Sequence, residues 1–278
     1  MSKTILITGA SSGIGKATSL FFAQKGWNVI ATMRNPEKET ELVGLPNIFV
    51  TQLEVTNLKS VQDAVKNGIG KFGEINALLN NAGYGQQGLF EAIPPEKIQQ
   101  QFDVNVFGLM NVTRTILPHF RKQQDGIIVN VTSGVGKIPF PITSIYTASK
   151  FAIEGFVEAL AYELDSQNIK VKIIEPGYIP TNFHQRAETE FAVNSALTDY
   201  DAFLQETNEL LDGLSSSEIS TPEDVAATIY QAITDNTHRL RYVAGSDIEQ
   251  IIEARKDKME HEYVSFLRRL FAPNGFKN

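Results

Sequence analysis

The sequence predicts a single α/β domain, built on a doubly wound parallel sheet of about seven strands with an inserted helical lid. Short β-branched runs recur along the chain, and most of the intervals between them have room for a helix. The 278 residues are 42% hydrophobic and 21% charged, and no linker rich in Pro, Gly or Ser divides them. These values are typical of one ordinary globular unit, so we expect one domain over 1–278.

Six apolar runs are expected to form strands, and a seventh run is a further candidate. The six are 4–8, 28–33, 48–53, 75–80, 126–132 and 171–176, and the candidate is 240–245. Strands that are apolar on both faces are typical of a parallel sheet covered by helices on each side. Right-handed crossovers between such strands produce a doubly wound sheet.

Two segments interrupt this alternation. Seven acidic residues lie between Glu188 and Asp212, where a direct connection from strand to helix would otherwise run. We interpret 182–217 as an inserted lid over a substrate, called the lid segment below. The segment 246–271 repeats apolar residues at helical spacing, which predicts a C-terminal helical extension.

Composition excludes several classes of function. The formal net charge of −7 argues against nucleic acid as a partner, and the absence of cysteine excludes disulfides and thiol nucleophiles. The four histidines show no metal-ligand spacing, so we read them as surface or structural residues and expect no metal. Apolar runs are strand-length, far below the roughly 20 residues that span a bilayer, and no secretory signal is evident. We expect a cytoplasmic protein with no membrane span.

A glycine-rich turn follows the first strand. The stretch TILITGASSGIGKAT places Gly9, Gly13 and Gly15 between that strand and the first helix. Such a turn lets backbone N–H groups and the helix N-terminus face a pyrophosphate. Glycine also serves tight turns that bind nothing. The position of this glycine-rich turn, directly after a strand, favours dinucleotide binding over a purely structural turn.

The residue that follows the second strand bears on which dinucleotide binds. An acidic residue about 20 positions after the glycines would bind the ribose hydroxyls of NAD, whereas a 2′-phosphate needs a cation. Here the sequence reads IATMRNP, so Arg34 occupies that place and the first acid is Glu37. NADP(H) is therefore favoured, with a solvated surface arginine as the alternative.

The stretch ITSIYTASKF predicts a helix that carries Tyr146 and Lys150 four residues apart on one face. A nearby ammonium and an oxidised nicotinamide would both stabilise the tyrosine phenolate, and the phenol would donate its proton in the reverse direction. Ser133 ends the 126–132 strand, where α/β folds place ligand-contacting residues. Each feature alone is weak evidence for catalysis, because serines are common in turns and a Tyr–Lys pair at this spacing also occurs by chance.

Taken together, the motifs resemble the short-chain dehydrogenase/reductase family over roughly the first 235 residues. They occur in family order, as TGASSGIG (8–15), NNAG (80–83), VNVFG with Asn105, Ser133, YTASK (146–150) and PGYIPT (176–181). The resemblance implies a Rossmann-type fold. The strand end ATMRNP and the long lid segment are also similar to the retinol and 17β-hydroxysteroid dehydrogenase branch, which implies a lipophilic substrate.

The resemblance implies a role for each matching catalytic residue. Tyr146 would be the acid/base, and Lys150 would bind the nicotinamide ribose and lower the tyrosine pKa. Ser133 would position the reacting carbonyl or alcohol, and Asn105 would hold a water in a proton relay. Without the resemblance, Asn105 would be read as a helix amide that satisfies nearby backbone.

The resemblance also implies the residues that bind cofactor and substrate. The cofactor residues would be Gly9, Ser11, Ser12, Gly13, Ile14, Gly15, Arg34, Glu54, Val55, Asn81, Ala82, Gly83, Tyr146, Lys150, Pro176, Gly177, Ile179 and Thr181. The substrate residues would be Ser133, Phe140, Tyr178 and Phe183. One departure is Glu54, which stands where many family members have Asp beside the adenine. Asn80 would brace the central sheet.

The expected reaction is hydride transfer between NADP(H) and a small-molecule alcohol or carbonyl compound. Two alternatives stay open: a non-catalytic NADP(H)-binding redox sensor, and an epimerase-like enzyme on the same scaffold. A sensor would commonly lack the tyrosine or lysine, and an epimerase would carry a TGxxGxxG turn and a longer C-terminal domain. Many family members form homodimers or homotetramers through the helices that contain Asn105 and Tyr146. The apolar face of 152–164 suits such an interface, and it suits buried packing within one chain equally.

Overall fold

The computed structural model describes residues 2–214 and 220–271, and within them seven parallel strands form one sheet. The strands are β1 Thr4–Thr8, β2 Asn28–Met33, β3 Ile48–Gln52, β4 Ala77–Asn80, β5 Gly126–Val131, β6 Ile169–Pro176 and β7 Arg241–Ala244. Their order across the sheet is β3-β2-β1-β4-β5-β6-β7. The predicted doubly wound, Rossmann-type sheet is confirmed, and so is its seventh strand.

Helices connect these strands and continue the chain after β7. The α-helices of the described residues are α1 Gly13–Gln24, α2 Leu58–Phe72, α3 Pro95–Phe102, α4 Leu109–Gln123, α5 Ser144–Asp165, α6 Asn182–Thr189, α7 Asp201–Leu214, α8 Pro222–Thr234, α9 Ser246–Lys256 and α10 Glu260–Phe271. A π-helical turn, Asp103–Gly108, joins α3 to α4. None of the helices in the described ranges is long and apolar enough to cross a membrane.

Side chains of each strand pack into two separate apolar layers. Ile5 and Ile7 point to the face covered by α1 and α8, whereas Leu6 points to the face covered by α2, α4 and α5. All three side chains are fully buried. This burial on both faces explains why the strand sequences are continuously apolar.

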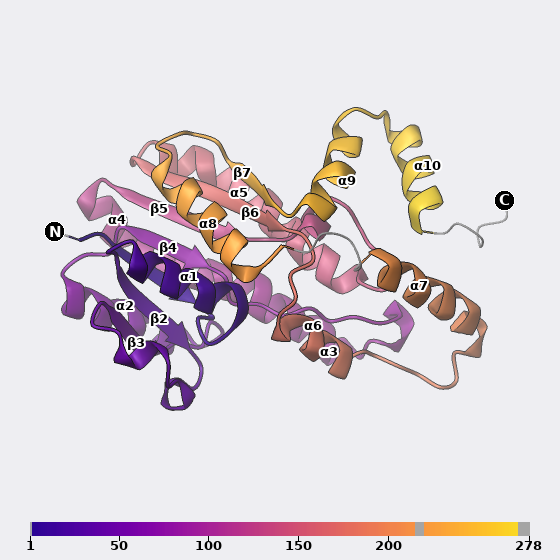
Figure 1. The fold of residues 1–278 in the computed structure, drawn as a ribbon, viewed down its shortest axis with the longest axis horizontal. Helices are drawn as coiled ribbons and strands as arrows, with labels where there is room; N and C mark the ends of the chain where they lie inside the picture. The colour runs from indigo at the N-terminus through magenta and orange to yellow at the C-terminus, as the bar shows by residue number, and fades with distance from the viewer. Residues whose placement is uncertain (1, 215–219, 272–278) are drawn as a thin grey trace.

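The sheet order places the functional edge. The chain moves outward from β1 to β3 and then returns to β4 beside β1, so the connections after β1 and β4 leave in opposite directions. Ligands bind at such a switch point in open α/β sheets. Figure 1 shows α6, α7, α9 and α10 gathered at one end of the molecule, beyond the carboxyl ends of the strands.

The two segments that interrupt the alternation are helical in the structure. Helices α6 and α7 occupy the lid segment up to residue 214, and its residues 215–217 lie outside the described residues. Helices α9 and α10 occupy the C-terminal extension. The function of the lid segment as a substrate cover stays a prediction.

Candidate active site

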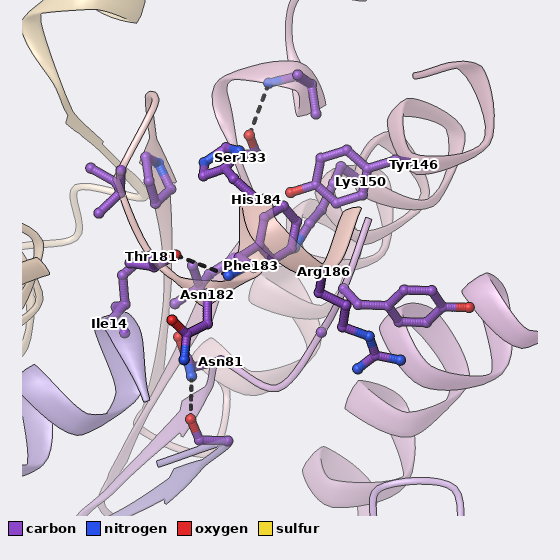
Figure 2. A pocket seen from close by; sticks show the side chains of 18 of the residues that line it. Ile14, Asn81, Ser133, Tyr146, Lys150, Thr181, Asn182, Phe183, His184 and Arg186 are labelled. Carbon is purple, nitrogen blue, oxygen red and sulfur yellow. Dashed lines mark hydrogen bonds between the residues drawn. The ribbon is translucent and has the colours of Figure 1, made fainter. Parts of the chain in front are cut away.

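A cavity of about 1170 Å³ runs along the carboxyl ends of the strands and is seen from close by in Figure 2. Most of the residues expected to bind cofactor or substrate line it. They are Gly9, Ser11, Ser12, Gly13, Ile14, Arg34, Glu54, Val55, Asn81, Ala82, Gly83, Ser133, Phe140, Tyr146, Lys150, Pro176, Gly177, Tyr178, Ile179, Thr181 and Phe183. Gly15 and Asn105 do not line it.

The glycine turn after β1 is shaped by close backbone contacts. Gly9 has a φ of +69° and Gly13 a φ of +52°, a region that favours glycine. A Cβ on Gly15 would lie 2.3 Å from the carbonyl oxygen of Gly9, so Gly15 lets α1 start close beneath the turn. Ser12 makes no capping hydrogen bond through its side chain, so the first N–H groups of α1 have no side-chain cap. This geometry fits a pyrophosphate.

Polar side chains after β4 hold the glycine turn against the sheet. The Asn81 amide donates to the carbonyl oxygens of Thr8 and Gly9, at 2.9 and 3.1 Å. The backbone N–H groups of Asn81 and Ala82 both donate to the Thr8 hydroxyl. Asn80, expected to brace the sheet, donates to the Asn130 side chain of β5 at 2.9 Å.

Arg34 follows the end of β2 and carries its positive charge next to the cavity. Arg34 is exposed on the cavity wall, and its guanidinium makes no ion pair or hydrogen bond with any residue of the described ranges. The carboxylate of Glu39, five residues further along the chain, has other partners: it accepts hydrogen bonds from the backbone of Glu41 and Leu42 and pairs with Lys16 at 3.4 Å. An unpaired arginine fits a 2′-phosphate.

Tyr146, Lys150 and Ser133 meet where β5 and α5 approach each other (Figure 2). Both side chains on α5 are buried, and the Lys150 ammonium donates to the carbonyl oxygen of Val131 at 2.9 Å. That ammonium lies 5.6 Å from the centre of the Tyr146 ring. Ser133 accepts a hydrogen bond from the N–H of Val135, which holds its hydroxyl at the cavity.

Burial dominates the acid–base properties of this pair. It raises the pKa of the Tyr146 phenol well above its ordinary value, and the hydrogen bond with Ser133 opposes the rise. Burial also lowers the pKa of Lys150 to about 8, which the negative charge of Glu154 opposes. Without cofactor, burial therefore keeps Tyr146 in its phenol form. The lowering of the tyrosine pKa by Lys150 and a bound nicotinamide stays a prediction.

Asn105 lies in the π-helical turn and is buried away from the cavity. Its amide accepts a hydrogen bond from the N–H of Tyr84 at 3.1 Å and donates to the Tyr84 carbonyl oxygen at 2.9 Å. It also donates to the Ser149 hydroxyl of α5. The side chain thus ties the Tyr84 loop to α5, the helix that carries Tyr146 and Lys150, and its role in a proton relay stays a prediction.

Aromatic rings line the end of the cavity next to Tyr146, which we call the substrate end because substrate is expected to bind there. Phe183 lies 5.6 Å from Tyr146 between ring centres, and His184 lies 4.2 Å from Tyr178. The sequence reading of His184 as a surface or structural residue missed its place on the cavity wall. Its only local signal was its position directly after Phe183 at the start of α6.

The C-terminal extension also closes the cavity, which the motifs gave no reason to expect. Asp247, Ile248 and Ile251 of α9 line it. The Asp247 carboxylate accepts a hydrogen bond from the N–H of Tyr178 at 2.8 Å. This contact fixes the loop after β6 to the start of α9.

The lid segment is attached to the Tyr84 loop at the far end of α6. The carbonyl of Glu190 accepts a hydrogen bond from the Gln86 amide at 3.0 Å, and its carboxylate pairs with Lys97 at 3.1 Å. The N–H of Ala192 donates to Gln87 at 2.9 Å. Further along the segment, Leu211 of α7 reaches the cavity wall.

A buried carboxyl lies directly before Pro176. Burial raises the pKa of Glu175 from 4.5 to about 7, and the neighbouring Glu154 adds to the rise. Between pH 4.5 and about 7, the folded protein keeps a proton that the unfolded chain loses. The stability contributed by this group therefore falls over that range and is lost once the pH has risen through about 7. We expect Glu175→Gln to remove this fall, worth up to roughly 3 kcal/mol.

Urea unfolding at several values between about pH 5 and pH 8 measures the effect. The free energy of unfolding of the parent should decrease more steeply with pH than that of Glu175→Gln. The exposed Glu163 of the same protein supplies the control, because Glu163→Gln should keep the parent slope. Parallel curves for the parent and Glu175→Gln would contradict the assignment.

Three further expectations concern metal binding, association between copies of the chain and location in the cell. No group of His, Asp and Glu suited to a metal ion occurs in the part of the chain that the structure describes. Phe107 of the π-helical turn and Tyr162 of α5 are exposed aromatic side chains on the elements expected to associate. The homo-oligomer and the cytoplasmic location stay predictions.

Comparisons with known proteins agree with this site. A family model described as short chain dehydrogenase matches residues 3–191. An uncharacterised oxidoreductase of Schizosaccharomyces pombe is 40% identical over 238 residues, which cover 85% of this chain and 98% of that protein. Bovine retinol dehydrogenase 8 is 34% identical over 248 residues, covering 83% of this chain and 78% of that protein.

Solved structures share the fold and carry nicotinamide cofactors. The protein ElxO with NADP bound is 28% identical, with a TM-score of 0.73, and the match covers 88% of this chain and 97% of that one. A 3-ketoacyl-(acyl-carrier-protein) reductase of Brucella melitensis complexed with NADH is 25% identical, with a TM-score of 0.75, and covers 87% and 96% of the two chains. On the family model, the sheet order and the ordered motifs, this chain belongs to the short-chain dehydrogenase/reductase family of oxidoreductases.

Proposed function

We propose that this protein is an NADP(H)-dependent oxidoreductase that interconverts a lipophilic secondary alcohol and its carbonyl compound. The observation that carries the proposal is the meeting of Ser133, Tyr146 and Lys150 in the same cavity as the glycine turn. A nicotinamide bound there would supply or accept the hydride. The protein would orient the substrate and move the proton.

The residues divide this work between them. In the reducing direction, Ser133 donates a hydrogen bond to the carbonyl oxygen and Tyr146 gives its phenolic proton to that oxygen as negative charge develops. Because its pKa is raised, the Tyr146 phenol stays protonated before hydride transfer and has a proton available for the substrate oxygen. Lys150 would bind ribose hydroxyls and stabilise the phenolate that remains.

NADP(H) is proposed over NAD(H) because of Arg34. Its guanidinium is exposed on the cavity wall and has no acidic partner among the described residues. A 2′-phosphate is a dianion, and an arginine is well shaped to bind it through two parallel hydrogen bonds.

A lipophilic substrate is proposed because of the rings at the substrate end. Phe140, Tyr178 and Phe183 line the cavity with Ile248 and Ile251 of α9. Pockets of this kind bind apolar molecules and use few polar groups for orientation. The similarity to a retinol dehydrogenase supports the same class.

A screen of NADPH oxidation over ketones, aldehydes, quinones and oxosteroids tests the proposal. We expect turnover with at least one lipophilic ketone or aldehyde, and weaker turnover with small hydrophilic carbonyl compounds. Tight NADPH binding with no turnover of any class would favour the redox sensor instead. Turnover of a nucleotide sugar without net NADPH oxidation would favour the epimerase-like alternative.

A further inference from the structure

A cluster of ionisable side chains lies one helical turn after Lys150 on α5, and we call it the charge cluster. It consists of Lys137, Glu154, Glu158, Glu175 and Arg241. Arg241 of β7 pairs with Glu154 at 3.0 Å and with Glu175 at 3.3 Å, and it also contacts Glu158. The Lys137 ammonium lies 3.5 Å from the Glu154 carboxylate. Within the cluster, Glu154 connects to the active site by two routes.

The first route runs through the backbone next to Ser133. Glu154 is only 4% exposed, and its carboxylate accepts a hydrogen bond from the Thr132 hydroxyl at 2.7 Å. Thr132 is the residue directly before Ser133, and its hydroxyl also lies 3.1 Å from the carbonyl of Ile174 in β6. The carboxylate thus helps to fix where β5 ends and Ser133 begins.

The second route is electrostatic and runs along α5. Glu154 follows Lys150 by one helical turn, so both side chains lie on the same face. Among the described residues, the Val131 carbonyl of β5 accepts a hydrogen bond from the buried ammonium, and the Tyr146 ring of α5 lies beside it. The cations of the cluster, Lys137 and Arg241, pair with Glu154. Lys150 forms no ion pair within the described ranges, so the charge of Glu154 acts without direct contact.

Two opposing effects act on the ionisation of Lys150, and the charge of Glu154 is one of them. Burial of the ammonium favours its neutral form, and the nearby carboxylate favours the charged form. A neutral amine would bind ribose hydroxyls less strongly and would no longer stabilise the Tyr146 phenolate. Loss of the negative charge should therefore show at pH values near neutrality.

We propose that Glu154 is a positioning residue for the reaction proposed above, because its carboxylate holds the strand end that carries Ser133 and lies one helical turn from the Lys150 ammonium. The inference rests on the proposed function for its catalytic consequence. The ionisation of Lys150 can be measured without any turnover.

The decisive variant is Glu154→Gln, with Glu158→Gln as its matched control. Glutamine keeps the shape of the side chain and can still accept from Thr132, but it carries no charge. Glu158 lies one turn further along the same helix and shares the partners Lys137 and Arg241, yet its side chain is about half exposed. A general loss of ion pairing would affect both variants, whereas the proposed role belongs to Glu154 alone.

Two readouts are needed. Lysine labelled with ¹³C at Cε reports the titration of Lys150 by NMR, with its signal assigned by its absence in Lys150→Arg. The alkaline limb of the pH profile of kcat/KM reports the same group during turnover. In Glu154→Gln both should move to lower pH by about one unit, and in Glu158→Gln both should stay in place.

Glu154→Asp provides a rescue variant and guards against misfolding of the glutamine variant. It keeps the charge, so the Lys150 titration should stay near that of the parent. A Lys150 titration that is unchanged in Glu154→Gln, with only a lower melting temperature, would overturn the inference. A shifted titration without turnover of any carbonyl compound by the parent would contradict the proposed function and leave the charge coupling in place.

Discussion

Replacing Tyr146 with Phe is expected to lower kcat by about 10³-fold while NADPH still binds. The change removes only the phenolic oxygen, which is the proposed proton donor. The ring contacts with Phe183 and with the Lys150 ammonium remain available to phenylalanine. Steady-state kinetics with a substrate from the screen measures the loss, and titration of NADPH fluorescence measures binding.

Tyr162→Phe is the matched control for this experiment. Tyr162 lies on the same helix, α5, and is 84% exposed, so its hydroxyl is remote from the cavity. Its variant should keep the kcat of the parent. Substantial turnover by Tyr146→Phe would mean that another group delivers the proton, and the assignment of the acid/base would have to be abandoned.

Replacing Arg34 with Ala is expected to weaken NADPH binding by about 10- to 100-fold and to leave NADH binding nearly unchanged. Hydrogen bonds between charged groups contribute about 1.5–3 kcal/mol, and each 1.4 kcal/mol corresponds to about tenfold in Kd. NADH lacks the 2′-phosphate, so it loses no such bond. Fluorescence titration of both cofactors with the parent and the variant measures the difference.

Lys38→Ala controls for a general loss of positive charge near this end of the cavity. Lys38 is an exposed cation four residues after Arg34, and it does not line the cavity. Its variant should keep the preference of the parent. If the parent itself bound NADPH and NADH equally, the interpretation of Arg34 would be wrong, and the free arginine would be an ordinary surface residue.

The fold was open to prediction because each strand carries its own signal. The runs predicted at 4–8 and 28–33 coincide with β1 and β2, and the run predicted at 240–245 contains β7. The strands are buried on both faces by helices, so they are apolar along their whole length. Two boundaries differ by two residues: β4 begins at Ala77 although the predicted run starts at Ile75, and β6 begins at Ile169 although the predicted run starts at Val171.

Several features of the site could not be predicted in this way. The backbone of Tyr178 is held by Asp247, which is 69 residues further along the chain, and Glu154 pairs with Arg241, which is 87 residues away. Local periodicity contains no information on contacts between such distant segments. The pKa directions of Tyr146 and Lys150 belong to the same class, because they depend on how deeply the folded protein buries the two groups.

The doubly wound sheet, the glycine turn and the placing of Tyr146 and Lys150 on one helix could be predicted from the sequence, because they follow from strand hydrophobicity and from spacing within single elements. The tertiary structure was needed to show that α9 closes the cavity, that His184 lies on its wall and that the charge cluster forms around Glu154. Packing between remote elements sets burial and long-range contacts, which no single segment encodes. Burial and these contacts control both the shape of the cavity and the ionisation of Tyr146 and Lys150.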